Sequence, residues 1–233
     1  MMTGLGQYAD VEVVGGFGSA GARGELERLA AGADVLVDFT TASAAAELLC
    51  EAARLGLHVV SGTSGLSADD LDAVNEALTN NRRSGLWAAN FAVGGALMMY
   101  FARVAARFME AAEVIEMHHD KKVDAPSGTA VQTAREIRAE READLPDPQV
   151  EKWTLEGSRG AVHRGVRIHS VRLPGLNAHQ EVLFGSLGQT LTIRHDALGR
   201  DAYLPGVALA VRQVPNQERP GLIRGLDTLM GLT

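Results

Sequence analysis

Short apolar runs alternate with helical segments and polar turns through the first part of the chain, and few folds allow this alternation. The helical segments span 41–55, which Thr41 or Ser43 can cap, and 67–78, which Ser67 can cap. The runs of strand composition are Val35–Asp38, Val59–Val60 and Leu86–Ala89. Repeated β-turn-α units predict a doubly wound (Rossmann-like) α/β domain, with a parallel sheet and helices on both faces.

The segments that follow these strands predict where a ligand binds. In an open parallel sheet, ligands bind beyond the carboxyl ends of the strands. Each segment also has an ordinary explanation, because Gly-Thr-Ser-Gly is a common loop and Asn90 can cap a turn. Three such ends in one sheet favour the wall of a cofactor site. The residues concerned are Asp38, Phe39 and Thr40, then Gly62, Thr63 and Ser64, then Ala88, Ala89, Asn90 and Phe91.

The glycine-rich start of the chain is either a dinucleotide-binding fingerprint or a chance pattern. A short strand over Val11–Val14 precedes Gly16–Gly21, which fits G-x-G-x-x-G, and a helix is expected over Gly24–Ala31. Asp38 lies 17 residues past Gly21, as in a dinucleotide fingerprint. However, six-residue glycine patterns also arise by chance in a chain with 26 glycines. The residues alone leave both interpretations open.

The second half of the chain has a different organisation. A helix is expected over 94–109, a strand over 111–117 and a polar loop over 144–164. Strands over 166–173, 181–185 and 189–195 follow without long helices between them, which predicts a mainly antiparallel sheet in an α+β domain. Helices are expected over 205–212 and 222–232. The predicted domains are residues 1–91 with 205–233, for nucleotide binding, and the inserted residues 92–204, for substrate binding.

The segment from Glu116 to Ala130, EMHHDKKVDAPSGTA, concentrates groups that bind anions and exchange protons. His118, His119, Lys121 and Lys122 lie between a strand end and the helix that Ser127-Gly128-Thr129 opens. Free N–H groups and the helix dipole favour an anion at such a helix start, and glycine allows close approach. Histidine also titrates near neutral pH. The arrangement suits a small acid with one or two carboxylates.

Simpler explanations exist for each part of this segment. A His-His or Lys-Lys pair most often lies on the surface without a functional role, and Ser-Gly-Thr is a common N-cap. A metal site is disfavoured, because adjacent histidines point opposite ways on a strand and no third ligand has suitable spacing. The compact arrangement of all the groups favours a functional site.

Composition excludes several classes of protein. The net charge of −7 argues against nucleic-acid binding, and no apolar run approaches the length of a membrane span. Cys50 is the only cysteine, so there is no internal disulfide. No signal peptide is recognisable at the start. We therefore expect a cytoplasmic protein.

The string H-H-x-x-K-x-D-A-P-S-G-T, from His118 to Thr129, resembles the active-site motif of the 4-hydroxy-tetrahydrodipicolinate reductase (dihydrodipicolinate reductase) family of lysine biosynthesis. Similarity extends over nearly the whole chain. Gly62-Thr63-Ser64 resembles the family's G-T-T cofactor loop, and Ala88–Phe91 its A-x-N-F segment. The segment from Arg172 to Gly175 resembles R-x-x-G, and His179-Gln180-Glu181-Val182 is an H-Q-E variant of H-E-V.

The resemblance implies NADH- or NADPH-dependent reduction of 4-hydroxy-tetrahydrodipicolinate to tetrahydrodipicolinate. It implies that His118 is a proton donor or acceptor and Lys122 the proton donor, whereas Lys121 replaces a variable neighbour. His119 would orient the dicarboxylate substrate, and the Ser127-Gly128-Thr129 helix start would hold one carboxylate. Gly62, Thr63, Ser64 and Ala88 to Phe91 would bind the cofactor. It also implies a homotetramer built through the second sheet.

The resemblance changes the interpretation of the start of the chain. In the family a first strand, a G-x-x-G-x-x-G loop and a helix precede the second strand. Residues 1–10 resemble the end of that helix and Val11–Val14 that second strand, so we expect the natural chain to begin upstream. Arg23 then hints at NADPH. The alternatives are a dicarboxylate-binding regulatory or inactive paralogue that has lost nucleotide binding, and another nicotinamide-dependent reductase.

Overall fold

The computed structural model describes residues 2–18 and 22–232, except for the side chains of 22 and 23. Two compact units result, one formed by residues 1–93 with 201–233 and the other by residues 94–200. Part of the glycine pattern 16–21 and the side chain of Arg23 lie outside the described residues. No helix in the described ranges is long and apolar enough to cross a bilayer.

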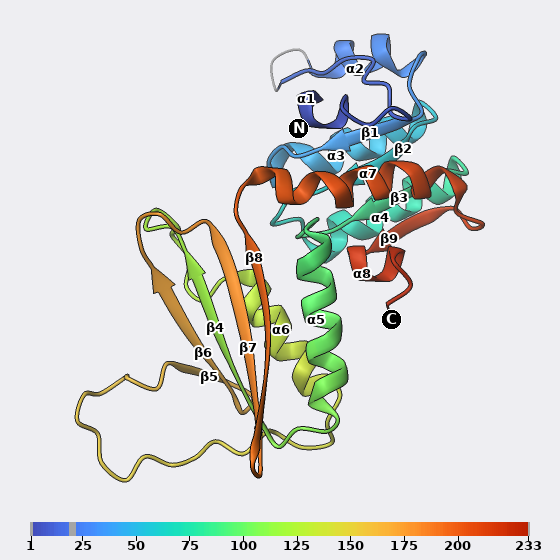
Figure 1. Ribbon diagram of the computed structural model, residues 1–233. Helices are drawn as coiled ribbons and strands as arrows, with labels where there is room; N and C mark the ends of the chain where they lie inside the picture. Colours follow the sequence, from blue (N-terminus) through green and yellow to red (C-terminus); the bar gives the residue numbers. More distant parts are fainter. Residues whose placement is uncertain (1, 19–21, 233) are drawn as a thin grey trace. The chain divides into compact units, whose positions relative to one another are not determined.

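The first unit contains a four-stranded parallel sheet (Figure 1). The strand order is β1-β2-β3-β9. The strands are β1 (Val35–Asp38), β2 (His58–Ser61), β3 (Ser84–Trp87) and β9 (Gly221–Arg224). The parallel α/β architecture predicted from the alternation is therefore confirmed.

Helices cover this sheet because their apolar residues recur on one side. The helices are α1 (Met2–Leu5), α2 (Ala22–Ala30), α3 (Ala42–Arg54), α4 (Ala68–Asn80), α7 (Leu204–Gln213) and α8 (Leu226–Leu229). Leu49 of α3 and Val74 and Leu78 of α4 bury against Val59 of β2. Ser67 caps α4 as predicted: its hydroxyl accepts from the amide of Asp70, whose carboxylate accepts from the amide of Ser67.

Two predicted elements of this unit are wrong. Val11–Val14 forms no strand: no described strand pairs with it, and Val13 and Val14 are exposed. The expected helix over 222–232 is instead strand β9 followed by the short α8. Leu222 and Ile223 of β9 pair with Gly85 and Leu86 of β3, so the sheet recruits this segment. Gly225, at φ +96°, then separates the strand from the helix.

The second unit contains a five-stranded mixed sheet in the order β5-β6-β4-β7-β8. Its strands are β4 (Ala111–His118), β5 (Ala161–His163), β6 (Val166–Arg172), β7 (Ala178–Ser186) and β8 (Gln189–Ala197). Only β4 and β6 run parallel, so the prediction of a mainly antiparallel sheet is confirmed.

Two helices, α5 (Val93–Ala106) and α6 (Gly128–Ala139), pack on one face of this sheet. Met98 and Ala102 of α5 and Ile137 of α6 bury against Val114 and Phe184 of the strands. No described helix covers the other face (Figure 1). Because β4 lies at the centre of the sheet, its carboxyl end and the segment leading into α6 are held by the core of the unit.

A close backbone contact in the first unit gives a stability prediction. A Cβ atom added at Gly206 of α7 would lie 2.1 Å from the carbonyl oxygen of Phe91, which cannot move without the backbone. Gly206→Ala should therefore cost about 1–3 kcal/mol of unfolding free energy. Each kilocalorie should lower the melting temperature by about 2–4 °C.

The matched control is Gly199→Ala, because a Cβ there meets no atom within 4 Å. Thermal unfolding followed by circular dichroism compares the two variants. Equal melting temperatures would show that α7 does not pack against the Phe91 carbonyl as described.

Candidate active site

The organising residue of the candidate active site is Glu116, on strand β4. Successive side chains of a strand point to opposite faces, so Ala112, Val114 and Glu116 all point into the core. Glu116 is nevertheless a carboxylic acid, and its side chain is 0% exposed. A buried charge is costly unless partners surround it.

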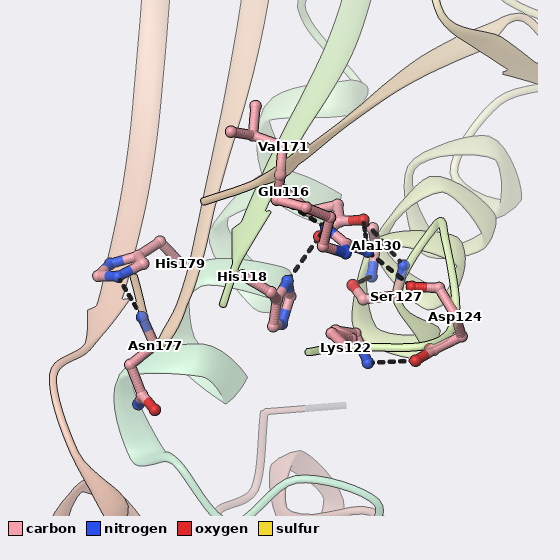
Figure 2. Close-up of polar contacts among 10 residues, drawn as sticks. Glu116, His118, Lys122, Asp124, Ser127, Ala130, Val171, Asn177 and His179 are labelled. Carbon is pink, nitrogen blue, oxygen red and sulfur yellow. Dashed lines mark hydrogen bonds and ion pairs between the residues drawn. The ribbon is translucent and has the colours of Figure 1, made fainter. Parts of the chain in front are cut away.

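Hydrogen bonds from Arg172, Ser127 and His118 reach the Glu116 carboxylate (Figure 2). The guanidinium of Arg172, at the end of β6, donates to both oxygens, at 2.8 Å to Oε2 and 2.7 Å to Oε1. The backbone amide of Ser127 donates to Oε1 at 3.2 Å. Nδ1 of His118 lies 2.5 Å from Oε2. One carboxylate thus joins β4, β6 and the start of α6.

These contacts shift the pKa of Glu116. Burial is the largest influence and raises the pKa, but hydrogen bonds from Arg172, Ser170 and His118 lower it, and the net direction is downward. Glu116 is therefore an acceptor of hydrogen bonds at neutral pH. Because its folded-state pKa is depressed, it stabilises the fold above about pH 4.5, and this contribution is lost as the pH falls.

His118 is a mostly buried imidazole, 15% exposed, at the end of β4. Burial, the largest influence, lowers its pKa, and the nearby charges of Lys122 and Arg172 lower it further, while Glu116 raises it. The net pKa lies below the ordinary value of 6.5, so the ring is neutral at neutral pH. It can accept a proton there.

Lys122 lies in the turn after the strand, close enough to His118 to affect its titration. Its ammonium donates to a carboxylate oxygen of Asp124 at 2.7 Å. This bond lowers the pKa of Asp124. The backbone carbonyl of Asp124 in turn accepts from Arg172 at 2.7 Å. Arg172 therefore links the lysine turn to the Glu116 carboxylate.

The first turn of α6 presents backbone amides of the kind that suit an anion. Ser127 is its N-cap, and the Ser127 hydroxyl accepts from the amide of Ala130 at 3.2 Å. In the described contacts, the amides of Gly128 and Thr129 have no acceptor, as is usual in a first helical turn. A Cβ at Gly128 would meet nothing within 4 Å, so the space in front of it is open. A carboxylate can approach both amides.

The remaining predicted residues of this unit lie less centrally. His119 is exposed, and its ring has no partner within the part of the chain that the structure describes. His179 belongs to a separate contact: its Nδ1 bonds Asp196 at 2.7 Å, and its Nε2 accepts from the amide of Asn177 at 3.2 Å. The structure thus brings together His118, Lys122 and Ser127 to Thr129. No described group of three or more His, Cys, Asp or Glu side chains could hold a metal ion.

The predicted cofactor residues lie at the carboxyl edge of the parallel sheet in the first unit. Asp38, 2% exposed at the end of β1, holds this edge together. Its Oδ1 accepts from the amide and hydroxyl of Thr40, at 3.0 and 2.6 Å. Its Oδ2 accepts from the hydroxyls of Ser61 and Thr63, at 2.7 and 2.8 Å. Thr63 is therefore buried, and its hydroxyl links the loop after β2 to the end of β1.

Aromatic rings complete this edge. The rings of Phe39 and Phe91 lie 5.6 Å apart, and the indole N–H of Trp87 donates to the carbonyl of Thr63 at 2.8 Å. A Cβ at Gly62 would lie 2.2 Å from the Phe39 ring, so a side chain there would displace that ring. Ser64 and Ala89 are exposed, and Asn90 is half-buried, with its Oδ1 accepting from the amide of Ala92.

Comparison with known proteins decides the family. The family described as dihydrodipicolinate reductase, N-terminus, matches residues 6–91, and its C-terminus counterpart matches residues 94–230. A 4-hydroxy-tetrahydrodipicolinate reductase of Mycobacterium sp. (strain KMS) is 50% identical over 201 residues, covering 86% of this chain and 81% of the relative. One from Cutibacterium acnes is 48% identical over 226 residues, covering 96% and 89%.

The chain belongs to the dihydrodipicolinate reductase family. Among solved structures, the dipicolinate-bound dihydrodipicolinate reductase from Paenisporosarcina sp. TG-14 is 42% identical, with a TM-score of 0.77. The alignment covers 84% of this chain and 73% of that one. The chain is therefore an oxidoreductase of this type.

Within this reductase family, sequence reasoning named the residues of the motif but missed the residues that hold them. The motif contains Glu116 but gives it no role, Arg172 stands out only as part of R-x-x-G, and Asp38 only as a strand end. The signal for Glu116 was available: in the run Ala112 to His118, alternation places a carboxylate at a core position, on the same face as a histidine.

The Glu116 contacts give a second stability prediction. Arg172→Ala should leave a buried carboxylate without its main partner, which costs about 3–5 kcal/mol of unfolding free energy at neutral pH. The loss should shrink as the pH falls through the depressed pKa of Glu116, because the wild-type ion pair then also weakens. Urea unfolding at several pH values measures both effects.

Arg194→Ala is the control, because Arg194 pairs with Glu181 and Asp196 at an exposed position. It should cost less than about 1 kcal/mol. A loss of similar size in the two variants would contradict the role assigned to Arg172.

Proposed function

We propose that the chain reduces 4-hydroxy-tetrahydrodipicolinate to tetrahydrodipicolinate, with loss of water, using NADH or NADPH, in diaminopimelate and lysine biosynthesis. One observation carries the proposal in a chain of this family. A neutral histidine and a lysine lie beside a helix start whose first amides are free for a carboxylate. The named relatives and the dipicolinate-bound neighbour support the choice of substrate.

The substrate site is assigned to the second unit. The amides of Gly128 and Thr129, with the Thr129 hydroxyl, hold one carboxylate of the substrate. Exposed His119 orients the ring, since its imidazole has no competing partner among the described residues. The open space in front of Gly128 gives a small cyclic dicarboxylate access to the helix end.

His118 and Lys122 are assigned to proton transfer. When bound, the nicotinamide supplies a hydride to the substrate ring, and the departing hydroxyl needs a proton to leave as water. Lys122 is the donor of that proton, and its ammonium is held by the Asp124 carboxylate. His118, with its depressed pKa, exchanges a proton with the substrate ring. A well-placed general acid contributes ~10²–10⁴-fold to the rate.

The carboxyl edge of the parallel sheet in the first unit offers hydrogen-bond donors that suit a nicotinamide cofactor. Gly62 has no side chain, so the loop backbone passes close to the Phe39 ring. The Ser64 hydroxyl is exposed, and the amide nitrogen of Asn90 has no described partner, so both can bond a carboxamide. Ala88, Ala89 and Phe91 contribute backbone and an apolar wall. Either NADH or NADPH satisfies these groups, and the side chain of Arg23, the hint for NADPH, lies outside the described residues.

We also propose a homotetramer and a cytoplasmic location. The open face of the second sheet supports the assembly, because it presents Val162, 49% exposed, and the half-buried Ile115 and Leu183. Sedimentation equilibrium should give four times the mass of the chain, and a monomer would refute the assembly. The single cysteine, Cys50, supports a reducing compartment.

A regulatory paralogue is the weaker alternative. Such a protein needs a dicarboxylate pocket but no proton-transfer groups. Here His118 and Lys122 are held in place by Glu116 and Asp124, which a binding protein would not require.

The proton-donor role predicts the effect of a single substitution. Lys122→Ala should lower kcat by a factor of ~10²–10⁴, because the leaving hydroxyl loses its acid, while nucleotide affinity stays the same. Steady-state kinetics and a nucleotide titration measure both.

Lys121→Ala is the matched control, since Lys121 is the exposed neighbour and makes no described ion pair. Its kcat should stay within about twofold of the wild type. An unchanged kcat in Lys122→Ala would refute the role of that lysine.

Cofactor binding is a separate prediction. Titrating the chain with NADPH and NADH should enhance nicotinamide fluorescence and saturate, because the edge around Gly62 and Asn90 fits the nicotinamide. Ser64→Ala should weaken binding several-fold, whereas Ser67→Ala, which removes only the α4 cap, should not. The absence of saturation with either nucleotide would count against the proposed function.

A further inference from the structure

We infer that Glu116 is a positioning residue that fixes the tautomer of His118, keeping the proton on Nδ1 so that Nε2 is the nitrogen that exchanges protons. The inference deepens the proposed function, because it rests on the role assigned there to His118. The role would be comparable to that of the aspartate that orients a histidine in a catalytic triad.

The first step concerns the direction of the bond between His118 and Glu116. Two nitrogens of Arg172 and the Ser127 amide donate to the Glu116 carboxylate, which leaves no proton on it to give away. An ionised carboxylate only accepts hydrogen bonds. The contact of 2.5 Å therefore requires the proton to lie on Nδ1 of His118.

The second step concerns the other nitrogen of the ring. Within the described part of the chain, Nε2 of His118 has no hydrogen-bond partner, and the side chain is 15% exposed. The charged groups that influence the ring are Glu116 on its own strand, Lys122 in the following turn and Arg172 at the end of β6. Both cations disfavour a protonated ring, so Nε2 carries a lone pair at neutral pH.

The third step links the tautomer to substrate binding. Glu116 Oε1 accepts the Ser127 amide, while Oε2 accepts from Nδ1 of His118. The same carboxylate thus holds the proton-exchanging ring and the cap of the helix that offers the amides of Gly128 and Thr129. Glu116 itself is fully buried and touches no solvent. It therefore acts through the groups it holds.

The isosteric variant Glu116→Gln tests the inference because an amide has one accepting and one donating end. Arg172 donates to both oxygen positions, but Oε1 also faces the Ser127 amide, which can only donate, whereas Oε2 faces His118, whose ring can accept; the amide oxygen should therefore occupy the Oε1 position. The amide nitrogen then faces His118, whose Nδ1 must become the acceptor. The proton of the neutral ring then lies on Nε2, so Nε2 has no free lone pair with which to accept a proton from the substrate.

The chain offers a matched control on the same strand. Glu113 accepts from Arg159 and bonds Nε2 of His169 at 2.8 Å, so it repeats the glutamate-histidine-arginine arrangement with the opposite ring nitrogen. Its side chain is 38% exposed and contacts none of the residues assigned to the reaction. Glu113→Gln should leave kcat within about twofold of the wild type.

Long-range ¹⁵N NMR of the ¹⁵N-labelled full chain reads the tautomers directly, with His118→Asn and His169→Asn assigning the signals. Above its pKa, wild-type His118 should show a protonated Nδ1 and a bare Nε2, and His169 the reverse. Glu116→Gln should exchange the two nitrogens of His118 alone. A wild-type His118 with the proton on Nε2, or a Glu116→Gln spectrum with an unchanged His118, would overturn the inference.

Kinetics supply the second readout. Glu116→Gln should lower kcat at least ~10²-fold, displace the pH dependence of kcat/KM and leave nucleotide affinity unchanged, and Glu116→Asp should restore part of the rate. Equal loss in Glu113→Gln would contradict the inference. If Glu116→Gln does not fold, the wild-type spectrum still decides, and if the chain does not turn over, the spectra still test Glu116 separately from the proposed function.

Discussion

In each unit one buried carboxylate near the carboxyl end of a strand holds the surrounding segments together. Asp38 accepts hydrogen bonds from Thr40, Ser61 and Thr63, and Glu116 bonds His118, Ser127 and Arg172. Burying a charge is unfavourable unless its acceptor positions are filled. Each carboxylate therefore constrains the geometry of the segments that supply its donors.

This constraint explains how groups at the end of a strand can be well placed. His118 and Lys122 lie where β4 ends, and loops of this kind are usually the least fixed parts of a fold. Here Arg172 reaches from β6 to both the Glu116 carboxylate and the Asp124 carbonyl, and Asp124 holds the lysine. Proton-transfer groups gain from such preorganisation, because a small displacement costs a large factor in rate.

Sequence patterns predicted the parallel unit and the mainly antiparallel unit because both depend on local periodicity. They failed where pairing with a distant strand decided the structure: Leu222 and Ile223 have an amphipathic pattern, yet they pair with β3. They also failed at Val11–Val14, which has the composition of a strand but pairs with no described strand. The motif residues could be named by resemblance, but the Arg172–Glu116 pair spans 56 residues, and no local pattern reports it.

The most direct test of the account is the oxidation of NADPH by the purified chain when 4-hydroxy-tetrahydrodipicolinate is added, followed by the loss of nicotinamide absorbance. The account predicts turnover that requires the substrate, forms one tetrahydrodipicolinate per NADPH consumed and is inhibited by dipicolinate, a flat dicarboxylate. Nucleotide binding without any substrate-dependent oxidation, for NADPH and NADH alike, would contradict it.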